Sequence, residues 1–300
     1  MFEPGYINLS RSGELEKRAE ELEAILKDCV LCPHECHVNR INDDLGTCNA
    51  PGALKVSSAF PHYGEERPLV GLNGSGTIFM TFCSMQCVFC QNSEISHEGE
   101  GQVLTIDEMA SAMLSLQNLG CHNINFVTPT HYVPQIIRSV YIAAERGLKV
   151  PLVYNTSGYD SLDTLKLLDG IIDIYMPDAK FAENSVGEMF TQAADYSDRM
   201  FDALKEMHRQ VGDLSTNPEG IAERGMLIRH LVMPGGLAGT DKMMKFIAEE
   251  LSENTYVNIM GQYRPCFLAN NYPELSRTPS REEMRKAKET ARNYGLHRGF

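Results

Sequence analysis

Three features that mark particular classes of protein are missing from this sequence. Basic residues are the minority, 27 Lys and Arg against 40 Asp and Glu, so the net charge is −13 and a surface for nucleic acid is not predicted. No stretch approaches the roughly 18 apolar residues of a membrane span. The first residues show no apolar run behind a basic start, the pattern of a secretory signal peptide. We therefore expect a cytoplasmic protein that binds neither nucleic acid nor membrane.

Cysteine, in contrast, is abundant and unevenly placed. Seven of the nine cysteines precede residue 91. In a cytoplasmic chain such clustering indicates metal or redox chemistry rather than disulfides. Of the other two, Cys121 stands at the start of a predicted strand and is expected to be buried, and Cys266 is expected to be an inert thiol.

Apolar patterning predicts strands that alternate with helices. Strands are expected at 76–82, 122–127, 150–155, 171–176, 225–233 and 255–260, and helices at 14–27, 105–119, 133–147, 161–168, 185–210, 241–251 and 281–294. Thr105 with Glu108, and Ser280 with Glu283, have the spacing of capping boxes. Short apolar strands that alternate with helices form parallel sheets covered on both faces. About six strands predict an α/β fold, a partial (β/α)6 barrel rather than a full barrel of eight.

The cysteines and the strands together divide the chain into three predicted parts. Residues 1–70 form an N-terminal helix and a cysteine-rich, metal-binding segment. Residues 71–262 form the partial barrel, and residues 263–300 form a tail and a last helix.

Residues 83–90, CSMQCVFC, place Cys83, Cys87 and Cys90 directly after a predicted buried strand. Zinc sites closed by four ligands are structural, and a disulfide framework needs an even number of cysteines. Three cysteines therefore indicate a metal centre with one position left open. A zinc site that borrows a fourth ligand is an alternative, but we favour a [4Fe–4S] cluster held by three thiolates.

The pattern C-x3-C-x2-C, with an aromatic residue before the third cysteine, resembles the radical S-adenosylmethionine (SAM) enzymes. The resemblance implies that SAM binds the open iron and that a reductant such as flavodoxin or ferredoxin supplies an electron that splits SAM. The resulting 5′-deoxyadenosyl radical then abstracts hydrogen from a substrate. The resemblance also implies that Phe89 lies near the adenine, with a place in the core as the alternative.

One position departs from the superfamily pattern. After the strand at 122–127 most members have Gly-Gly-Glu, which meets the amino group of SAM, whereas this chain has Thr128, Pro129 and Thr130. The hydroxyl of Thr128 could accept a hydrogen bond from that amine.

The segment 176–180, MPDAK, resembles the Asp-x-Lys of glycyl-radical-enzyme activases, the group of pyruvate formate-lyase activating enzyme. The resemblance implies that Lys180 contacts the SAM carboxylate, with a solvated surface lysine as the alternative, and that Arg229 lies near SAM. It also implies a monovalent cation beside SAM, held by Asn155, Thr156, Asp178 and the carbonyl of Met176. Asparagine replaces an aspartate of that pattern at position 155, and carbonyl oxygens still suit hard cations.

Longer stretches between about residues 29 and 265 resemble an uncharacterised branch of the superfamily whose members are named after pyruvate formate-lyase activating proteins. They include LCPHECHVNR, NINFVTPTHYVPQI, RHLVMPGGLAG and NIMGQYRP. The implied substrate is a backbone glycine of a partner glycyl-radical enzyme. Tyr263 and Arg264 either contact this partner or make structural hydrogen bonds. The alternatives are modification of a small molecule or another peptide and, less favoured, an electron-transfer protein with two clusters.

A second set of cysteines precedes the first predicted strand. Cys29, Cys32, Cys36 and Cys48 form C-x2-C-x3-C-x11-C, and four ligands make a closed site. A structural zinc or a second iron–sulfur cluster fits this number, and four reduced thiols in a loop are the alternative. The spacing does not decide between the metals, and we lean toward zinc or another structural metal.

Overall fold

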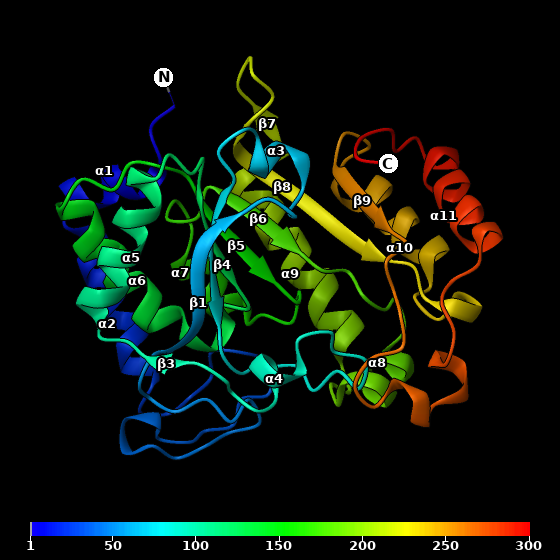
Figure 1. Ribbon diagram of the computed structural model, residues 1–300, viewed down its shortest axis with the longest axis horizontal. Coiled ribbons are helices and arrows are strands. Elements are labelled where there is room, and N and C mark those ends of the chain that lie inside the picture. The colour runs from blue at the N-terminus through cyan, green and yellow to red at the C-terminus, as the bar shows by residue number, and fades with distance from the viewer. Residues whose placement is uncertain (1) are drawn as a thin grey trace.

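The computed structural model describes residues 2–300, so Met1 of the predicted N-terminal segment lies outside the described residues. A mixed sheet runs through its centre in the order β3-β1-β2-β4-β5-β6-β8-β7, with β9 paired to β8 (Figure 1). Its strands are β1 (Lys55–His62), β2 (Ser75–Met80), β3 (Gln102–Val103), β4 (Ile124–Val127), β5 (Leu152–Thr156), β6 (Ile174–Pro177), β7 (Ser215–Thr216), β8 (Ala222–Leu231) and β9 (Tyr256–Met260).

Six strands form the parallel part of this sheet, β2, β4, β5, β6, β8 and β9. They coincide, within a few residues, with the six strands that the sequence predicts, and the sheet does not close, so the partial α/β barrel is confirmed. The antiparallel strands β1, β3 and β7 were not predicted. Strand β1 lies near one edge and contains Pro61, which lacks the N–H that a central strand needs.

Helices and short turns connect the strands. The helices are α1 (Gly5–Arg11), α2 (Glu14–Ile25), α3 (Arg67–Val70), α4 (Ser93–Ser96), α5 (Ile106–Asn118), α6 (Val133–Glu145), α7 (Leu162–Leu167), α8 (Asn184–Thr191), α9 (Tyr196–Val211), α10 (Thr240–Phe246) and α11 (Arg281–Asn293). The shorter turns are η1 (Arg40–Asn42), η2 (Thr130–Tyr132), η3 (Pro234–Gly236), the π-turn η4 (Ile247–Leu251), η5 (Ala269–Asn271) and η6 (Pro273–Leu275). Both predicted capping boxes are present, at the starts of α5 and α11.

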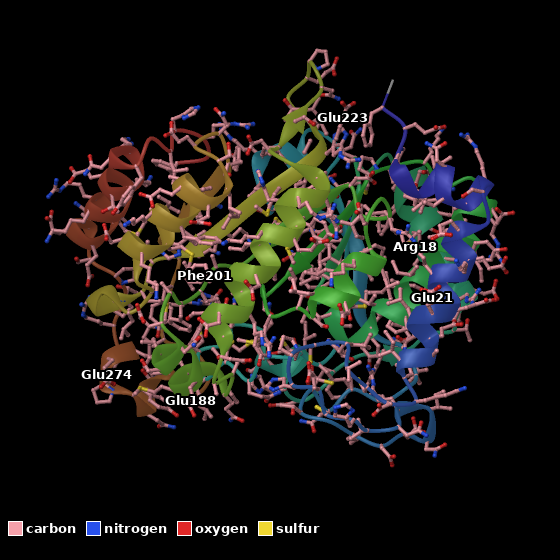
Figure 2. The ribbon with its side chains drawn as sticks, turned by 180° about the vertical axis from the view of Figure 1, so that it is seen from behind. Arg18, Glu21, Glu188, Phe201, Glu223 and Glu274 are labelled. Carbon is pink, nitrogen blue, oxygen red and sulfur yellow. The ribbon has the colours of Figure 1, made fainter. Side chains whose placement is uncertain are left out.

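The helices cover the outer face of the sheet, as Figure 2 shows from behind, where α2 and α9 cross this face. Ile78 of β2 belongs to the large outer core together with Met109 and Met113 of α5. A smaller apolar cluster fills the inside of the barrel and includes Leu69 of α3 and Val153 of β5. Since α3 follows β1, whose last residues pair with the start of β2, this cluster closes the amino ends of the strands and leaves their carboxyl ends for a site.

No helix within residues 2–300 has the length and apolar content that a bilayer crossing needs.

Asp173, just before β6, ties the N-terminal helix to the sheet. Its two carboxylate oxygens accept hydrogen bonds from the backbone N–H groups of Gly5 and Leu152, each at 3.0 Å. A side chain at position 5 is excluded, because a Cβ on Gly5 would lie 2.3 Å from the carbonyl oxygen of Gly170. Burial raises the pKa of Asp173 from 3.8 to about 7, although both backbone N–H groups lower it.

We predict that Asp173→Ala lowers the free energy of unfolding by about 1–3 kcal/mol, because it leaves two backbone donors without acceptors. The folded pKa lies above the unfolded value, so the stabilising effect of Asp173 is fully present near pH 4 and declines as the pH rises toward about 7. Urea denaturation at several pH values should therefore show the largest difference from wild type near pH 4.

Asp163→Ala is the matched control, because that side chain is 91% exposed on α7, and we expect it to change stability by less than about 0.5 kcal/mol. Equal effects of the two substitutions would contradict the anchoring role of Asp173.

Candidate active site

The predicted cysteine triplet lies in the loop between β2 and α4, at the carboxyl edge of the parallel strands (Figure 1). Cys87 is buried, and Cys83 and Cys90 are half-buried. Burial raises the pKa of Cys87 to about 12, while the nearby ammonium of Lys180 lowers it and Cys90 raises it. Burial also raises the pKa of Cys83, and the neighbouring thiols of Cys87 and Cys90 raise it further. The three thiols therefore share one environment, in which a metal centre must replace their protons.

Backbone hydrogen bonds fix this loop on both sides. Phe82, just before the first cysteine, has a φ of 65°, and its N–H donates to the carbonyl of Ile95 at 2.9 Å. Val88 donates to the carbonyl of Phe190 near the end of α8 at 3.0 Å, and accepts from Leu268 of the C-terminal tail at 2.9 Å. The position of the thiols is thus set by residues far apart in the sequence.

No group of three or more His, Cys, Asp or Glu side chains within residues 2–300 is arranged so that it could hold a metal ion. A [4Fe–4S] cluster is larger than one ion, and its thiolates bind different irons. The donor set Cys83, Cys87 and Cys90, three thiols within eight residues on one loop, fits such a cluster by its chemistry.

A buried charge cluster stands at the ends of β5, β6 and β8. Arg229 donates from Nε to Oδ1 of Asp178 at 2.7 Å and from Nη2 to Oδ1 of Asn155 at 2.7 Å, and Lys180 donates from Nζ to the other Asp178 oxygen at 2.5 Å. The three charged side chains are only 15–19% exposed. Burial alone would raise the pKa of Asp178, but Arg229 and Lys180 lower it below its usual value. The structure thus brings together four of the residues that the sequence analysis assigned to the SAM and cation sites.

Thr156 faces a different set of partners from Asn155. Because successive residues of a strand point to opposite faces, its hydroxyl lies with Tyr154 and donates to Asp160 at 2.5 Å. Asp160 is 2% exposed and also accepts from Tyr154 at 2.9 Å and Thr130 at 2.8 Å. Sequence reasoning missed Asp160, whose only signal is its place five residues after a predicted strand end.

Thr128 is held in an unusual backbone conformation at the end of β4. Its φ is 58°, a left-handed value that β-branched residues rarely adopt, and its N–H donates to the carbonyl of Asn155 at 2.8 Å. Such strain persists only where the surroundings enforce it and is commonest at functional sites.

The remaining predicted contacts are more enclosed. Phe89 is 6% exposed and packs edge-on against Phe181 and Tyr263, with ring centroids 5.8 and 6.1 Å away. Met176 is fully buried in the inner apolar cluster. The hydroxyl of Tyr263 donates to the carbonyl of Leu275 at 2.7 Å, which favours the structural alternative for this residue.

The four-cysteine segment forms a tightly turned loop below the barrel, beside the loop that carries the triplet (Figure 1). Cys29, Cys32 and Cys48 are buried and Cys36 is half-buried. Burial raises the pKa of Cys48, and the guanidinium of Arg40 lowers it.

Arg40 is 1% exposed and donates to three backbone carbonyls, those of Ala50, Pro51 and His131. Among the described salt bridges it has no carboxylate partner. A buried cation without a carboxylate is stabilised by other negative charge nearby, and metal-bound thiolates would supply it.

Two side-chain hydrogen bonds join the two cysteine loops. Nε2 of His34 lies 2.8 Å from the carbonyl oxygen of Ser84, and Gln86 donates to the carbonyl of Thr47 at 3.3 Å. The four-cysteine loop therefore supports the triplet loop directly.

A sequence model of the radical SAM superfamily matches residues 77–235, just over half of the chain. An uncharacterized protein of Methanocaldococcus jannaschii is 34% identical over 292 residues, which cover 94% of this chain and 79% of that protein. Among solved structures, HydG, a maturase of the [FeFe]-hydrogenase, has a TM-score of 0.51 at 14% identity. The match covers 74% of this chain and 50% of the HydG chain, and at that identity it shows a shared fold alone.

The matched region begins in the strand that leads to the triplet and includes the charge cluster. Enzymes of this superfamily use a [4Fe–4S] cluster and SAM and need a reductant. By the extent of the match and the three cysteines, the chain belongs to the radical SAM superfamily.

Proposed function

We propose that this protein is a radical SAM oxidoreductase of the activating-enzyme type, with Cys83, Cys87 and Cys90 as the cluster ligands. When bound, the cluster and SAM supply a 5′-deoxyadenosyl radical, which removes a hydrogen atom from the substrate. The proposal rests on the closeness of the thiols to the charge cluster. The ammonium of Lys180 lowers the pKa of Cys87, and the same ammonium is paired with Asp178.

In this proposal the charge cluster holds SAM. Lys180 contacts the carboxylate of SAM, Arg229 lies beside it, and Thr128 accepts a hydrogen bond from its amine. Asp178 pairs with both cations and so keeps them together in a site from which water is largely excluded. Phe89 forms an apolar wall for the adenine.

A monovalent cation beside SAM is part of the same proposal. Its ligands are side-chain oxygens of Asn155 and Asp178 and the carbonyl of Met176, all at the ends of neighbouring strands. Thr156, whose hydroxyl is bonded to Asp160, positions this strand end.

The proposed hydrogen donor is a backbone glycine of a partner glycyl-radical enzyme, because Asp178 and Lys180 have the Asp-x-Lys spacing of the activases and lie together at the end of β6. Flavodoxin or ferredoxin is the proposed electron donor.

The first prediction from this proposal concerns the cleavage of SAM. After anaerobic reconstitution with iron and sulfide and reduction with dithionite, wild type should convert SAM to 5′-deoxyadenosine, measured by chromatography. Cys87→Ala should form none, because it removes one of three cluster ligands. Cys121→Ala, which changes a buried cysteine outside the triplet, is the control and should retain the activity. The proposal would be refuted if wild type formed no deoxyadenosine and the EPR spectrum of its cluster did not change when SAM was added.

The second prediction concerns Thr128. Thr128→Gly should raise the free energy of unfolding by about 1 kcal/mol, because glycine adopts a positive φ without strain. It should also weaken SAM binding by about fivefold, the effect of one lost hydrogen bond. Thr128→Ser keeps the hydroxyl and should restore the affinity. Equal dissociation constants for SAM in the glycine and serine variants would show that the hydroxyl does not contact SAM.

The third prediction concerns the four-cysteine loop, for which we propose a tetrathiolate metal centre. Because the four thiols are not arranged around a single ion in this structure, metal binding has to draw them together. A variant with Cys83, Cys87 and Cys90 all changed to alanine should still contain metal, which elemental and sulfide analysis would identify. One zinc per chain indicates the structural ion, and about four irons with sulfide indicate a second cluster. A folded variant with neither metal would mean that the four cysteines are free thiols.

A further inference from the structure

Strand β1 and the loop that follows it, residues 63–66, precede the matched region 77–235. Strand β1 pairs antiparallel with β2, so that Phe60 lies opposite Thr77 and His62 opposite Ser75. The sheet therefore gains a strand on the side where the barrel does not close. Nothing in the proposed function uses the side chains of this strand.

The loop after β1 crosses the gap between the two edges of the open barrel. Glu65 is 9% exposed, and its Oε2 lies 3.6 Å from Nη1 of Arg229 on β8. Glu66 accepts a hydrogen bond from Nδ2 of Asn258 on β9 at 2.9 Å. The carboxylates of Glu65 and Glu66 thus contact the β8–β9 edge of the barrel from the β1 side. Glu65 contacts Arg229, a member of the charge cluster of the proposed SAM site.

These carboxylates are incompletely bonded. No nitrogen lies within hydrogen-bond distance of Glu65 among the described ion pairs: Nη1 of Arg229 and Nδ1 of His62 are each 3.6 Å from one of its oxygens. Its side-chain hydrogen bond is with Glu66, which raises the pKa of Glu65. Nδ1 of His62 is buried and has no hydrogen-bond partner among residues 2–300, and the second oxygen of Glu66 has none apart from the carboxyl of Glu65. Buried polar atoms are nearly always bonded, so several at one place indicate a ligand. If closing the barrel were the only role of this loop, its polar atoms would be expected to be paired.

Two aromatic rings pack against His62, whose Nδ1 lies 3.6 Å from an oxygen of Glu65. Phe60 and Phe79 stack with centroids 5.7 Å apart, and His62 packs edge-on against both at 5.7 and 5.9 Å. Phe60 is 41% exposed and Tyr63 is 63% exposed. Phe79 stands four residues before Cys83 on the chain. A continuous path of contacts therefore runs from the triplet end of β2 through the rings to Glu65 and Arg229.

The charges at this place favour a positive ligand. Glu65, Glu66 and Asp178 carry three carboxylates, against one guanidinium on Arg229 and one ammonium on Lys180. Burial raises the pKa of Glu65 to about 7, although Arg229 lowers it, and a further cation would stabilise the ionised form. Aromatic faces beside carboxylates are the surroundings that organic cations prefer in proteins.

We propose that Glu65 and Glu66, together with the rings of Phe60 and Phe79, bind a primary ammonium or guanidinium group of the substrate. The inference deepens the proposed function and rests on it, because it names the substrate group that is held beside the radical source. Glu65 then forms a charge-assisted hydrogen bond with the cation, and Phe60 and Phe79 cover its apolar stem.

The test is a titration of the reconstituted enzyme, with its cluster oxidised and without SAM or reductant. The probes are n-butylammonium and n-butylguanidinium, followed by saturation-transfer NMR, with butyrate and 1-butanol as the anionic and neutral controls. We expect at least one of the two cations to bind and neither control to do so. Because no SAM is cleaved in this experiment, its result is independent of whether deoxyadenosine is formed.

Glu65→Gln keeps the shape of the side chain and should weaken cation binding by about tenfold. Glu219→Gln, on an exposed turn, is the matched control and should bind like wild type. Phe60→Leu, at a partly exposed position, should weaken binding by about threefold, because it removes part of the ring surface that covers the apolar stem. This variant provides the test if Glu65→Gln does not fold. Butyrate binding as tightly as the cations, or unchanged binding in both variants, would overturn the inference.

Discussion

The carboxylate of Asp178 holds two cations that would otherwise repel each other, and the mouth of the barrel depends on it. Its place follows from the backbone, because it continues β6, forms a bridge with Arg229 of β8, and is followed by Ala179, whose N–H donates to the carbonyl of Arg229 at 2.8 Å. Tyr196 of α9 holds the same turn, since its hydroxyl contacts the carbonyls of Ser157 and Asp178. Removing one partner of such a buried group leaves an unpaired charge, at a cost of about 3–5 kcal/mol.

Around this interaction the protein combines elements from three parts of the chain. The family-matched barrel supplies the triplet and the charge cluster, the N-terminal segment supplies the four-cysteine loop, and the C-terminal tail bonds to Val88 within the triplet loop. The two cysteine loops touch through His34 and Gln86. A shift of the first loop would therefore reach the second through these two hydrogen bonds.

Local signals in the sequence were sufficient to predict much of this arrangement. The six parallel strands are apolar runs, and the capping boxes at Thr105 and Ser280 need only residues three apart. The charge cluster could be predicted because parallel strands end at one edge, which brings Asn155 and Asp178 together.

Other features depend on contacts that no local pattern shows. Strand β1 was missed because Pro61 and its mixed polarity do not resemble a strand, and β7 is too short to have a pattern. Without β1, nothing indicated that Glu65 crosses to Arg229. The hydroxyl of Thr156 donates to Asp160 because the strand places it on the face opposite Asn155. The spacing of residues in the sequence could not predict this partner.

The way in which the barrel fails to close determines how it can deform. Between most neighbouring strands, separation would break a ladder of backbone hydrogen bonds. Between the β1 side and the β8–β9 edge, the contacts are made by side chains: Glu65 pairs with Arg229, Glu66 with Asn258, and Leu69 packs in the apolar cluster with Leu227. Widening the barrel along this line therefore leaves every strand pairing intact. The resulting opening is lateral, so a long polymer can approach the centre of the barrel sideways without threading an end through a pore.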